Sequence, residues 1–224
     1  MSSAGSSENI LLEGLFFTIE GGEGAGKSTL LNKLRDALKA GGYDVITTRE
    51  PGGTSLAEEL RAIFLNPHYK GKICSRAELF MMLAARAQHV EELIRPALFE
   101  GKIVLCDRFS DSTIAYQGYG RGLGGDYVQN LCEFSAFSLK PHMTFLLDVP
   151  PQIGLARARS VVEKGSPDRI EAEALQFHEN VRAGFLKMSE KDLARFCVLD
   201  ATHPPELIFD FAWAALQRTF HLMG

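Results

Sequence analysis

The sequence predicts an α/β fold: a five-stranded parallel sheet with helices on both faces. Short apolar runs alternate along the chain with longer segments of helical periodicity, which is typical of such a sheet. The first apolar run leads directly into a glycine-rich loop and a helix, the local order of a nucleotide-binding α/β unit. With 46% hydrophobic residues among 224, the chain can bury a sizeable core.

The expected elements follow from these two patterns. The strands are short apolar runs, at residues 15–20, 44–48, 103–106, 143–148 and 196–200. The helices fall between them, near residues 27–40, 55–65, 76–95, 125–138, 151–160, 171–190 and 204–220. Ligands of a parallel sheet bind beyond the carboxyl ends of its strands, so the residues after each strand are the first candidates for function.

The chain shows no internal repeat and no long linker. Residues 1–14 contain no basic segment and no long apolar core, and we expect a flexible leader there rather than a signal peptide. Residues 15–224 then form one domain. Within it, residues 157–169 have the glycine and proline content of a short lid and no apolar periodicity after residue 160.

A phosphate-binding pattern, G-x-x-x-x-G-K-[ST], runs from Gly21 to Ser28 between the first strand and the first helix. Glycines let backbone amides turn toward an anion, the helix N-terminus adds partial positive charge, and Lys27 adds a full charge. Ser28 can ligate Mg²⁺. We therefore expect a nucleoside triphosphate with Mg²⁺ on this loop. The candidate ATP-binding residues are Gly21, Gly22, Glu23, Gly24, Ala25, Gly26, Lys27, Ser28, Thr29 and Arg157.

Charged residues follow the next two strands. Arg49 precedes a Pro-Gly-Gly turn and can reach the cleft; the alternative is a surface arginine paired with Glu50. Asp107 follows four apolar residues, as does the aspartate that positions Mg²⁺ beside a phosphate loop; the alternative is a helix cap or a surface acid. Arg108 comes directly after it. We expect Ser28 and Asp107 at the metal.

Three further arginines are candidate site residues: two near the expected lid and one inside an expected helix. Arg157 and Arg159 lie where the lid begins, or else on a solvated basic face. Arg86 lies in a run that is apolar on every face, and a buried guanidinium needs partners. A polar ligand edge is slightly favoured over an internal carboxylate as the partner of Arg86.

These cations exceed what one triphosphate requires. They could clamp two phosphorylated molecules, and an acceptor phosphate is mostly dianionic near neutral pH, so it needs no general base. The enzyme has to hold two phosphates in line and exclude water. The pattern indicates a nucleoside monophosphate kinase. The expected catalytic residues are Lys27, Arg108, Arg157 and Arg159.

The ordered motifs resemble those of the bacterial thymidylate kinase family over residues 15 to 220. The motifs are "EGGEGAGKST", "TREPGGT", "LAARAQHVE", "DRFSDSTIAYQGYGRG", "LLDVP", "DRIE" and "LDAT". The resemblance implies the P-loop nucleoside monophosphate kinase fold, transfer from ATP to dTMP with Mg²⁺, and a homodimer. An alternative is a kinase of this fold acting on another monophosphate.

The resemblance also implies roles for individual residues. Arg49 and Arg108 would bind the dTMP phosphate, Glu23 would lie beside the 3′-hydroxyl, and Arg86 would donate to a thymine carbonyl. Tyr116 would disfavour a ribose 2′-hydroxyl. The full expected dTMP-binding set is Glu23, Arg49, Met82, Arg86, Arg108, Thr113, Tyr116 and Gln117.

Three positions bear on the subtype and on departures from the family. Gly24 stands where another subtype has arginine, so this chain resembles the subtype whose catalytic arginines come from the lid. Val161 stands where related lids often have a third alternate arginine, and the next cation is Lys164. Met82 stands where the family usually stacks a phenylalanine on thymine; the alternative is a core methionine.

The composition excludes other classes. The net charge of −4 argues against nucleic-acid or membrane-surface binding, and no apolar run is long enough to span a membrane. A GTP-dependent switch would need an N-K-x-D motif, but "NKLR" at residues 32–35 lacks the aspartate. A catalytically silent nucleotide-binding module is opposed by the full cation set. The four dispersed cysteines are expected to be reduced thiols of a cytoplasmic protein.

Overall fold

The computed structural model describes residues 14–161 and 168–222. Of the expected leader, only Gly14 is described, and its N–H donates to the carbonyl of Leu98 at 2.9 Å. Lys164 lies outside the described residues. Among the described residues, no helix is both long and apolar enough to cross a bilayer.

Five parallel strands form one sheet, as expected, and their order in the sheet is β2-β3-β1-β4-β5. The strands are β1 (Leu15–Gly21), β2 (Val45–Arg49), β3 (Ile103–Asp107), β4 (Met143–Asp148) and β5 (Phe196–Asp200). Their bounds agree with the expected ones to within one residue. Because β1 is central, the loop that follows it emerges in the middle of the carboxyl edge.

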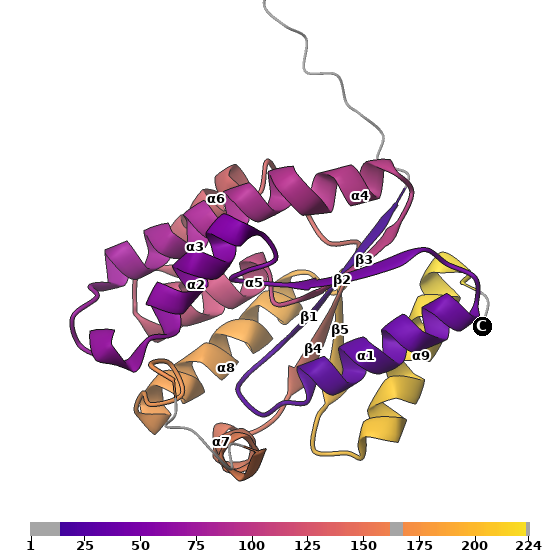
Figure 1. Cartoon of the computed structure of the whole chain (residues 1–224). Helices are drawn as coiled ribbons and strands as arrows, with labels where there is room; N and C mark the ends of the chain where they lie inside the picture. Colours follow the sequence, from indigo (N-terminus) through magenta and orange to yellow (C-terminus); the bar gives the residue numbers. More distant parts are fainter. Residues whose placement is uncertain (1–13, 162–167, 223–224) are drawn as a thin grey trace, which may run out of the picture.

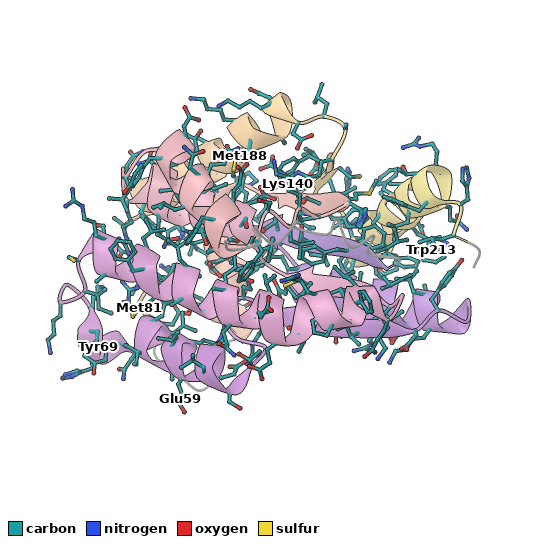
Figure 2. The ribbon with its side chains drawn as sticks, turned by 90° about the horizontal axis from the view of Figure 1, so that it is seen from above. Glu59, Tyr69, Met81, Lys140, Met188 and Trp213 are labelled. Atoms are coloured by element: carbon teal, nitrogen blue, oxygen red, sulfur yellow. The ribbon has the colours of Figure 1, made fainter. Side chains whose placement is uncertain are left out.

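Helices cover both faces of the sheet (Figure 1). One face carries α1 (Lys27–Ala40) and α9 (Pro205–Phe220). The other layer contains α2 (Ser55–Leu65), α3 (Ser75–His89), the π-helical η2 (Val90–Ile94), α4 (Arg95–Phe99), α5 (Ser110–Thr113), the π-helical η3 (Ile114–Gly120), α6 (Gly125–Ser135) and α8 (Leu175–Lys191). A 3₁₀ turn, η1 (Pro67–Tyr69), follows α2, and α7 (Pro151–Val161) follows β4. Seen from above, α2 with Glu59 runs beside α3 with Met81 (Figure 2).

Side-chain alternation along β1 divides the core between the two layers. Phe17 and Ile19 pack in the cluster that includes α1 and α9. Phe16 packs in a second cluster with residues of η2, α4 and β3. Thr18 and Glu20 share the face of Phe16, and both are buried polar side chains. Their partners lie in the layer that builds the site.

Three helical predictions needed correction. The expected helix 76–95 runs on through η2 and α4 to Phe99, since the residues at both junctions, His89 and Ile94, keep right-handed helical φ and ψ. The helix expected over 125–138 ends at Ser135, because Phe137 and Ser138 adopt positive φ. The helix expected from residue 171 begins at Leu175.

Residues 110–120 form α5 and η3, which the sequence pattern did not predict. The segment contains two glycines and a β-branched Thr-Ile pair, all poor helix formers. It is buried on nearly all sides, so it shows no amphipathic period. This helical segment carries three of the expected site residues, namely Thr113, Tyr116 and Gln117.

Candidate active site

The phosphate loop lies between the end of β1 and the start of α1. Gly24 and Gly26 have φ values of 64° and 92°, a region that favours glycine. The ammonium of Lys27 folds back and donates to the carbonyl of Gly22 at 2.7 Å. Burial and the positive charge of Arg108 lower the pKa of Lys27. The loop thus holds its lysine at the mouth of an anion cradle.

A contact between two glycines joins the phosphate loop to α7. A Cβ on Gly24 would lie 1.9 Å from the carbonyl oxygen of Gly154, and a Cβ on Gly154 would lie 2.3 Å from that of Glu23. Neither position has room for a side chain. Glycine at both lets α7 approach the loop, and Arg157 follows Gly154 by one helical turn.

Two large cavities border the phosphate loop. The phosphate-loop cavity, of about 470 Å³, is lined by residues 23–29, Arg49, Glu50, Arg61, Asp107, Arg108, Arg157, Ala158, Asp168 and Glu171. The Ala201 cavity, of about 420 Å³, is lined by residues 24–26, Thr29, Leu30, Leu147, Arg157, residues 201–205 and Ile208. They share loop residues and Arg157. The loop after β5 thus borders a hollow beside the phosphate loop.

A third cavity of about 100 Å³, the Met82 cavity, opens on the other side of Arg108. It is lined by Glu23, Glu50, Pro51, Arg61, Phe64, Leu65, Met82, Arg108, Ser112, Tyr116, Gln117, Asp168 and Ile170. Glu23 and Arg108 line both this cavity and the phosphate-loop cavity. The two hollows therefore meet at a set of charged side chains that includes this arginine and this carboxylate; Glu50, Arg61 and Asp168 also line both.

Arg108 is fixed by several contacts at this meeting point. Its guanidinium donates to the carbonyl of Gly21 at 2.9 Å, to Ser112 Oγ at 3.1 Å and to Glu23 Oε1 at 2.9 Å. It also lies 5.0 Å from the ring centre of Tyr116, whose hydroxyl donates to Glu23 at 2.6 Å. Burial alone would raise the pKa of Glu23, but the charges of Arg108 and Lys27 lower it to about 2. Glu23 is an ionised anchor at neutral pH.

Asp107 and Ser28 lie together at the phosphate-loop cavity. Ser28 Oγ donates to Asp107 Oδ2 at 3.2 Å, and Asp107 Oδ1 is buried without a hydrogen-bond partner. Asp107 is only partly exposed, and it is not the N-cap of the helix that follows, which is Phe109. An orphaned carboxylate oxygen beside a hydroxyl and an anion cradle fits a hard cation such as Mg²⁺. Within the described residues, no group of three His, Cys, Asp or Glu side chains could hold a metal, so such an ion would depend on the phosphates for other ligands.

Arg86 is fully buried and has its partners inside the protein. Its guanidinium contacts Glu50 Oε2 at 2.7 and 2.8 Å, Thr113 Oγ1 at 2.9 Å and Cys132 Sγ at 3.3 Å. The sequence slightly favoured a polar ligand edge over an internal carboxylate as the partner of Arg86. The internal carboxylate is present in the structure, and Thr113 belongs to the same network. A direct contact between Arg86 and a base stays a prediction.

Arg49 lies at the edge of the phosphate-loop cavity. It pairs with Glu58 at 2.9 Å, and 54% of its side chain is exposed. The alternative partner considered from sequence, Glu50, is wrong, because that carboxylate is buried against Arg86 and His89. Arg49 can therefore turn toward a ligand without leaving a buried charge behind.

Met82 and Gln117 line the Met82 cavity from α3 and η3. Met82 is 6% exposed and also belongs to a core cluster, so the two alternatives for this residue are not exclusive. Gln117 donates to Glu78 at 2.9 Å, while its Oε1 is buried without a partner. One wall of the cavity is thus a thioether, and another carries an unsatisfied amide oxygen.

The expected lid is described only at its two ends. Arg157 donates to the carbonyl of Ala201 at 2.6 Å and lines both cavities beside the phosphate loop. Arg159 is exposed and is not among the described residues that line these cavities. At the other end, Arg169 is buried and pairs with Glu78 at 2.6 Å. Arg169 is therefore an anchor rather than part of a solvated loop.

Several residues that the sequence did not reveal also belong to the site. Arg61 lines both the phosphate-loop and Met82 cavities and donates to the carbonyl of Pro51 at 2.9 Å. His178 is buried, lines a small cavity together with Glu23, and has an Nε2 without a hydrogen-bond partner. Gly154 packs against the phosphate loop, and the side chain of Glu20 accepts from backbone N–H groups after β3. None of these residues directly follows a strand, and Glu20 lies within β1, whose apolar run concealed it.

Comparisons with known proteins agree on one family. The model of the thymidylate kinase family matches residues 19–211. Thymidylate kinase of Protochlamydia amoebophila is 49% identical over 210 residues, covering 92% of this chain and 93% of that protein. That of Desulfovibrio desulfuricans is 50% identical over 196 residues, covering 86% and 90%. The crystal structure of thymidylate kinase from Ehrlichia chaffeensis aligns with a TM-score of 0.73 at 31% identity, covering 91% of this chain and 99% of that one.

Proposed function

Since the chain belongs to the thymidylate kinase family and phosphorylates dTMP to dTDP with ATP, we propose how its cavities divide the two substrates. ATP occupies the phosphate-loop cavity with its base in the Ala201 cavity, and dTMP occupies the Met82 cavity. The observation that carries this assignment is that Arg108 and Glu23 line both the first and the last of these. Transfer then takes place where Arg108 stands.

The chemistry asks for positioning and charge more than for proton transfer. The dTMP phosphate has a second pKa of about 6, so one of its oxygens attacks the γ-phosphorus directly while the bond to the β,γ-bridging oxygen breaks and ADP leaves. Lys27 and Arg157 would offset negative charge on the ATP side, and Arg108 and Arg49 on the dTMP side. Arg159 would join only when the lid closes.

Mg²⁺ fits the pair Ser28 and Asp107. Ser28 Oγ and the orphaned Oδ1 of Asp107 are oxygen donors, which Mg²⁺ prefers, and both residues line the cavity assigned to the triphosphate. The ion would neutralise charge on the β- and γ-phosphates. Asp107 would act on the metal or on its waters.

Recognition of thymidine is assigned to the Met82 cavity. Met82 would cover a face of the base, and the free Oε1 of Gln117 could accept a hydrogen bond from it. Tyr116 and Glu23 would border the sugar, with Glu23 accepting from the 3′-hydroxyl and Tyr116 crowding a 2′-hydroxyl. Arg86 would act on the base from behind this wall, with Thr113 holding its guanidinium.

We assign the chain to the subtype with arginines in the lid. Gly24 has positive φ and no space for a Cβ, so an arginine at this loop position is disfavoured sterically. Arg157 on α7 already borders the triphosphate cavity. We also place the protein in the cytoplasm, because its four cysteines are free thiols.

A homodimer is proposed through the outer faces of α3 and α6, which pack against each other. Phe80 on α3 is 58% exposed, and Tyr127 and Phe134 on α6 are 60% and 85% exposed. Exposed aromatic side chains on adjoining helices are typical of protein interfaces. Sedimentation velocity should give a dimer, and Phe134→Glu should shift it to monomer. Phe211→Glu is the control, because Phe211 is 53% exposed on α9, and it should leave the dimer intact.

The division of substrates is tested by kinetics of Arg108→Ala and Lys27→Ala. Arg108→Ala should weaken the binding of dTMP by roughly 2–3 kcal/mol and leave the KM for ATP nearly unchanged. Lys27→Ala should lower kcat on the order of a hundredfold. Arg121→Ala is a matched control, because Arg121 has the same exposed side-chain fraction as Arg108, 16%, and also pairs with carboxylates. A loss of ATP affinity without loss of dTMP affinity in Arg108→Ala would reverse the assignment.

A further inference from the structure

Glu20 is a fully buried carboxyl group at the carboxyl end of β1, where the reaction proposed above does not use it. It points away from α1, toward the turn that follows β3. Its Oε1 accepts from the backbone N–H of Phe109 at 2.7 Å and from that of Ser112 at 3.3 Å. Its Oε2 contacts Ser112 Oγ at 2.5 Å. All three partners flank or follow Arg108 in the chain.

The backbone of Arg108 is held in an unfavourable conformation. Its φ of 67° lies in the left-handed region, which costs a non-glycine residue free energy unless surrounding contacts impose it. The N–H of Arg108 donates to the carbonyl of Ile19, and its own carbonyl accepts from the thiol of Cys106, both at 3.0 Å. The next N–H, that of Phe109, is held by Glu20. Buried groups thus fix the turn on both sides of the arginine.

Ser112 continues this restraint to the guanidinium. Its hydroxyl contacts Glu20 Oε2 and also accepts from Arg108 Nη1 at 3.1 Å. Glu20 therefore restrains both the backbone and, through one hydroxyl, the charged end of the same residue. Neither Phe109 nor Ser112, the two residues that Glu20 contacts here, is expected to touch a phosphate.

We propose that Glu20 is a positioning residue that aims Arg108 at the phosphate of dTMP. This inference rests on the proposed role of Arg108 in binding that phosphate. Glu20 fixes the backbone of the turn after β3. Through Ser112, it also fixes the position of the Arg108 guanidinium where the two cavities meet. Without it, the turn relaxes toward a negative φ and the guanidinium leaves the position shared by both substrates.

The charge state of Glu20 suggests an informative variant. Burial and the negative charge of Asp111 raise the pKa of Glu20 to about 8, so an uncharged side chain of the same shape is a close mimic near neutral pH. In Glu20→Gln, the amide oxygen can accept from both N–H groups, and the amide nitrogen can donate to Ser112 Oγ. Glu20→Ala removes all three contacts.

The experiment measures both KM values, kcat and melting temperature for Glu20→Ala, Glu20→Gln and a control, Thr18→Val. Thr18 is buried two residues earlier on the same face of β1, but its hydroxyl contacts Thr144, at 2.8 Å. Glu20→Ala should raise the KM for dTMP at least roughly tenfold, with the KM for ATP within about twofold. Glu20→Gln should restore the KM for dTMP. Thr18→Val should lower the melting temperature without changing either KM.

Glu20→Met, of similar length, replaces Glu20→Ala if the alanine variant does not fold, and the same rise is expected. A KM for dTMP that stays at the wild-type value in the folded variant overturns the inference, as does a glutamine variant as defective as alanine. An equal rise in Thr18→Val also overturns it, because the effect would then be general destabilisation. Arg108→Ala tests the proposed role of Arg108 separately from that of Glu20. If it leaves the KM for dTMP unchanged, the proposed function itself is wrong.

Discussion

Replacing Gly154 by alanine should have two opposing effects: a gain in helix propensity and a steric clash between α7 and the phosphate loop. Alanine inside a helix normally stabilises by up to about 1 kcal/mol relative to glycine. In this structure, however, the added Cβ would lie 2.3 Å from the carbonyl oxygen of Glu23, and contacts of Cβ atoms under 3.0 Å are essentially never seen. The loop and α7 must therefore separate by at least 0.7 Å.

The separation should reach the chemistry through Arg157, which lies three residues after Gly154 on α7. A misplacement of about 1 Å can cost on the order of a hundredfold in rate. We expect Gly154→Ala to lower kcat by about ten- to a hundredfold and to raise the KM for ATP more than that for dTMP. The crowding, which typically costs about 1–3 kcal/mol, should also cancel the gain from propensity.

A coupled assay of ADP formation and a urea titration on the same preparations measure both effects. Ala156→Gly is the matched control, since Ala156 is exposed on the same helix. It should lose about 1 kcal/mol of stability and keep its kinetic constants. A Gly154→Ala protein that is more stable than the wild type and has normal kcat would refute the reasoning.

Three further predictions follow from the site. Met82→Ala should raise the KM for dTMP and also destabilise by about 2–5 kcal/mol, because Met82 both lines the cavity and packs in the core, whereas Met82→Phe should retain activity; a dTMP KM unchanged in Met82→Ala would exclude a role on the base. Arg86→Met should cost about 3–5 kcal/mol in urea unfolding, since it leaves the buried carboxylate of Glu50 without its cation, and a cost below about 1 kcal/mol would contradict the ion pair. Asp107→Asn should raise the half-saturating Mg²⁺ concentration at least about tenfold with little change in melting temperature; an unchanged Mg²⁺ requirement would remove Asp107 from the metal.

The sheet was predictable because each strand is a short apolar run closed by turn residues, and because parallel strands bring their carboxyl ends to one edge. The phosphate loop, Asp107 and Arg108 come from distant parts of the chain, and the structure places them around one cavity. Such residues are found from sequence because their position follows from the strand that precedes them.

Other features depend on tertiary packing that no local pattern encodes. Glu50 looked like a surface turn residue, yet it is buried as the partner of Arg86, which changes the meaning of that arginine. The helical segment 110–120 is enclosed on almost all sides and so loses the periodicity that would reveal it. The role of Gly154 depends on its close contact with the backbone carbonyl of Glu23, more than a hundred residues earlier in the chain.

The most direct test of the account is the rate of ADP formation with ATP and each of dTMP, dUMP, UMP, CMP, GMP and AMP as acceptor. The Met82 cavity, with its apolar wall and with Tyr116 at the expected sugar position, predicts the highest kcat/KM for dTMP, a lower value for dUMP, and little transfer to the ribonucleotides. A higher kcat/KM for any of the other acceptors, or release of ADP that does not depend on an acceptor, would contradict the account.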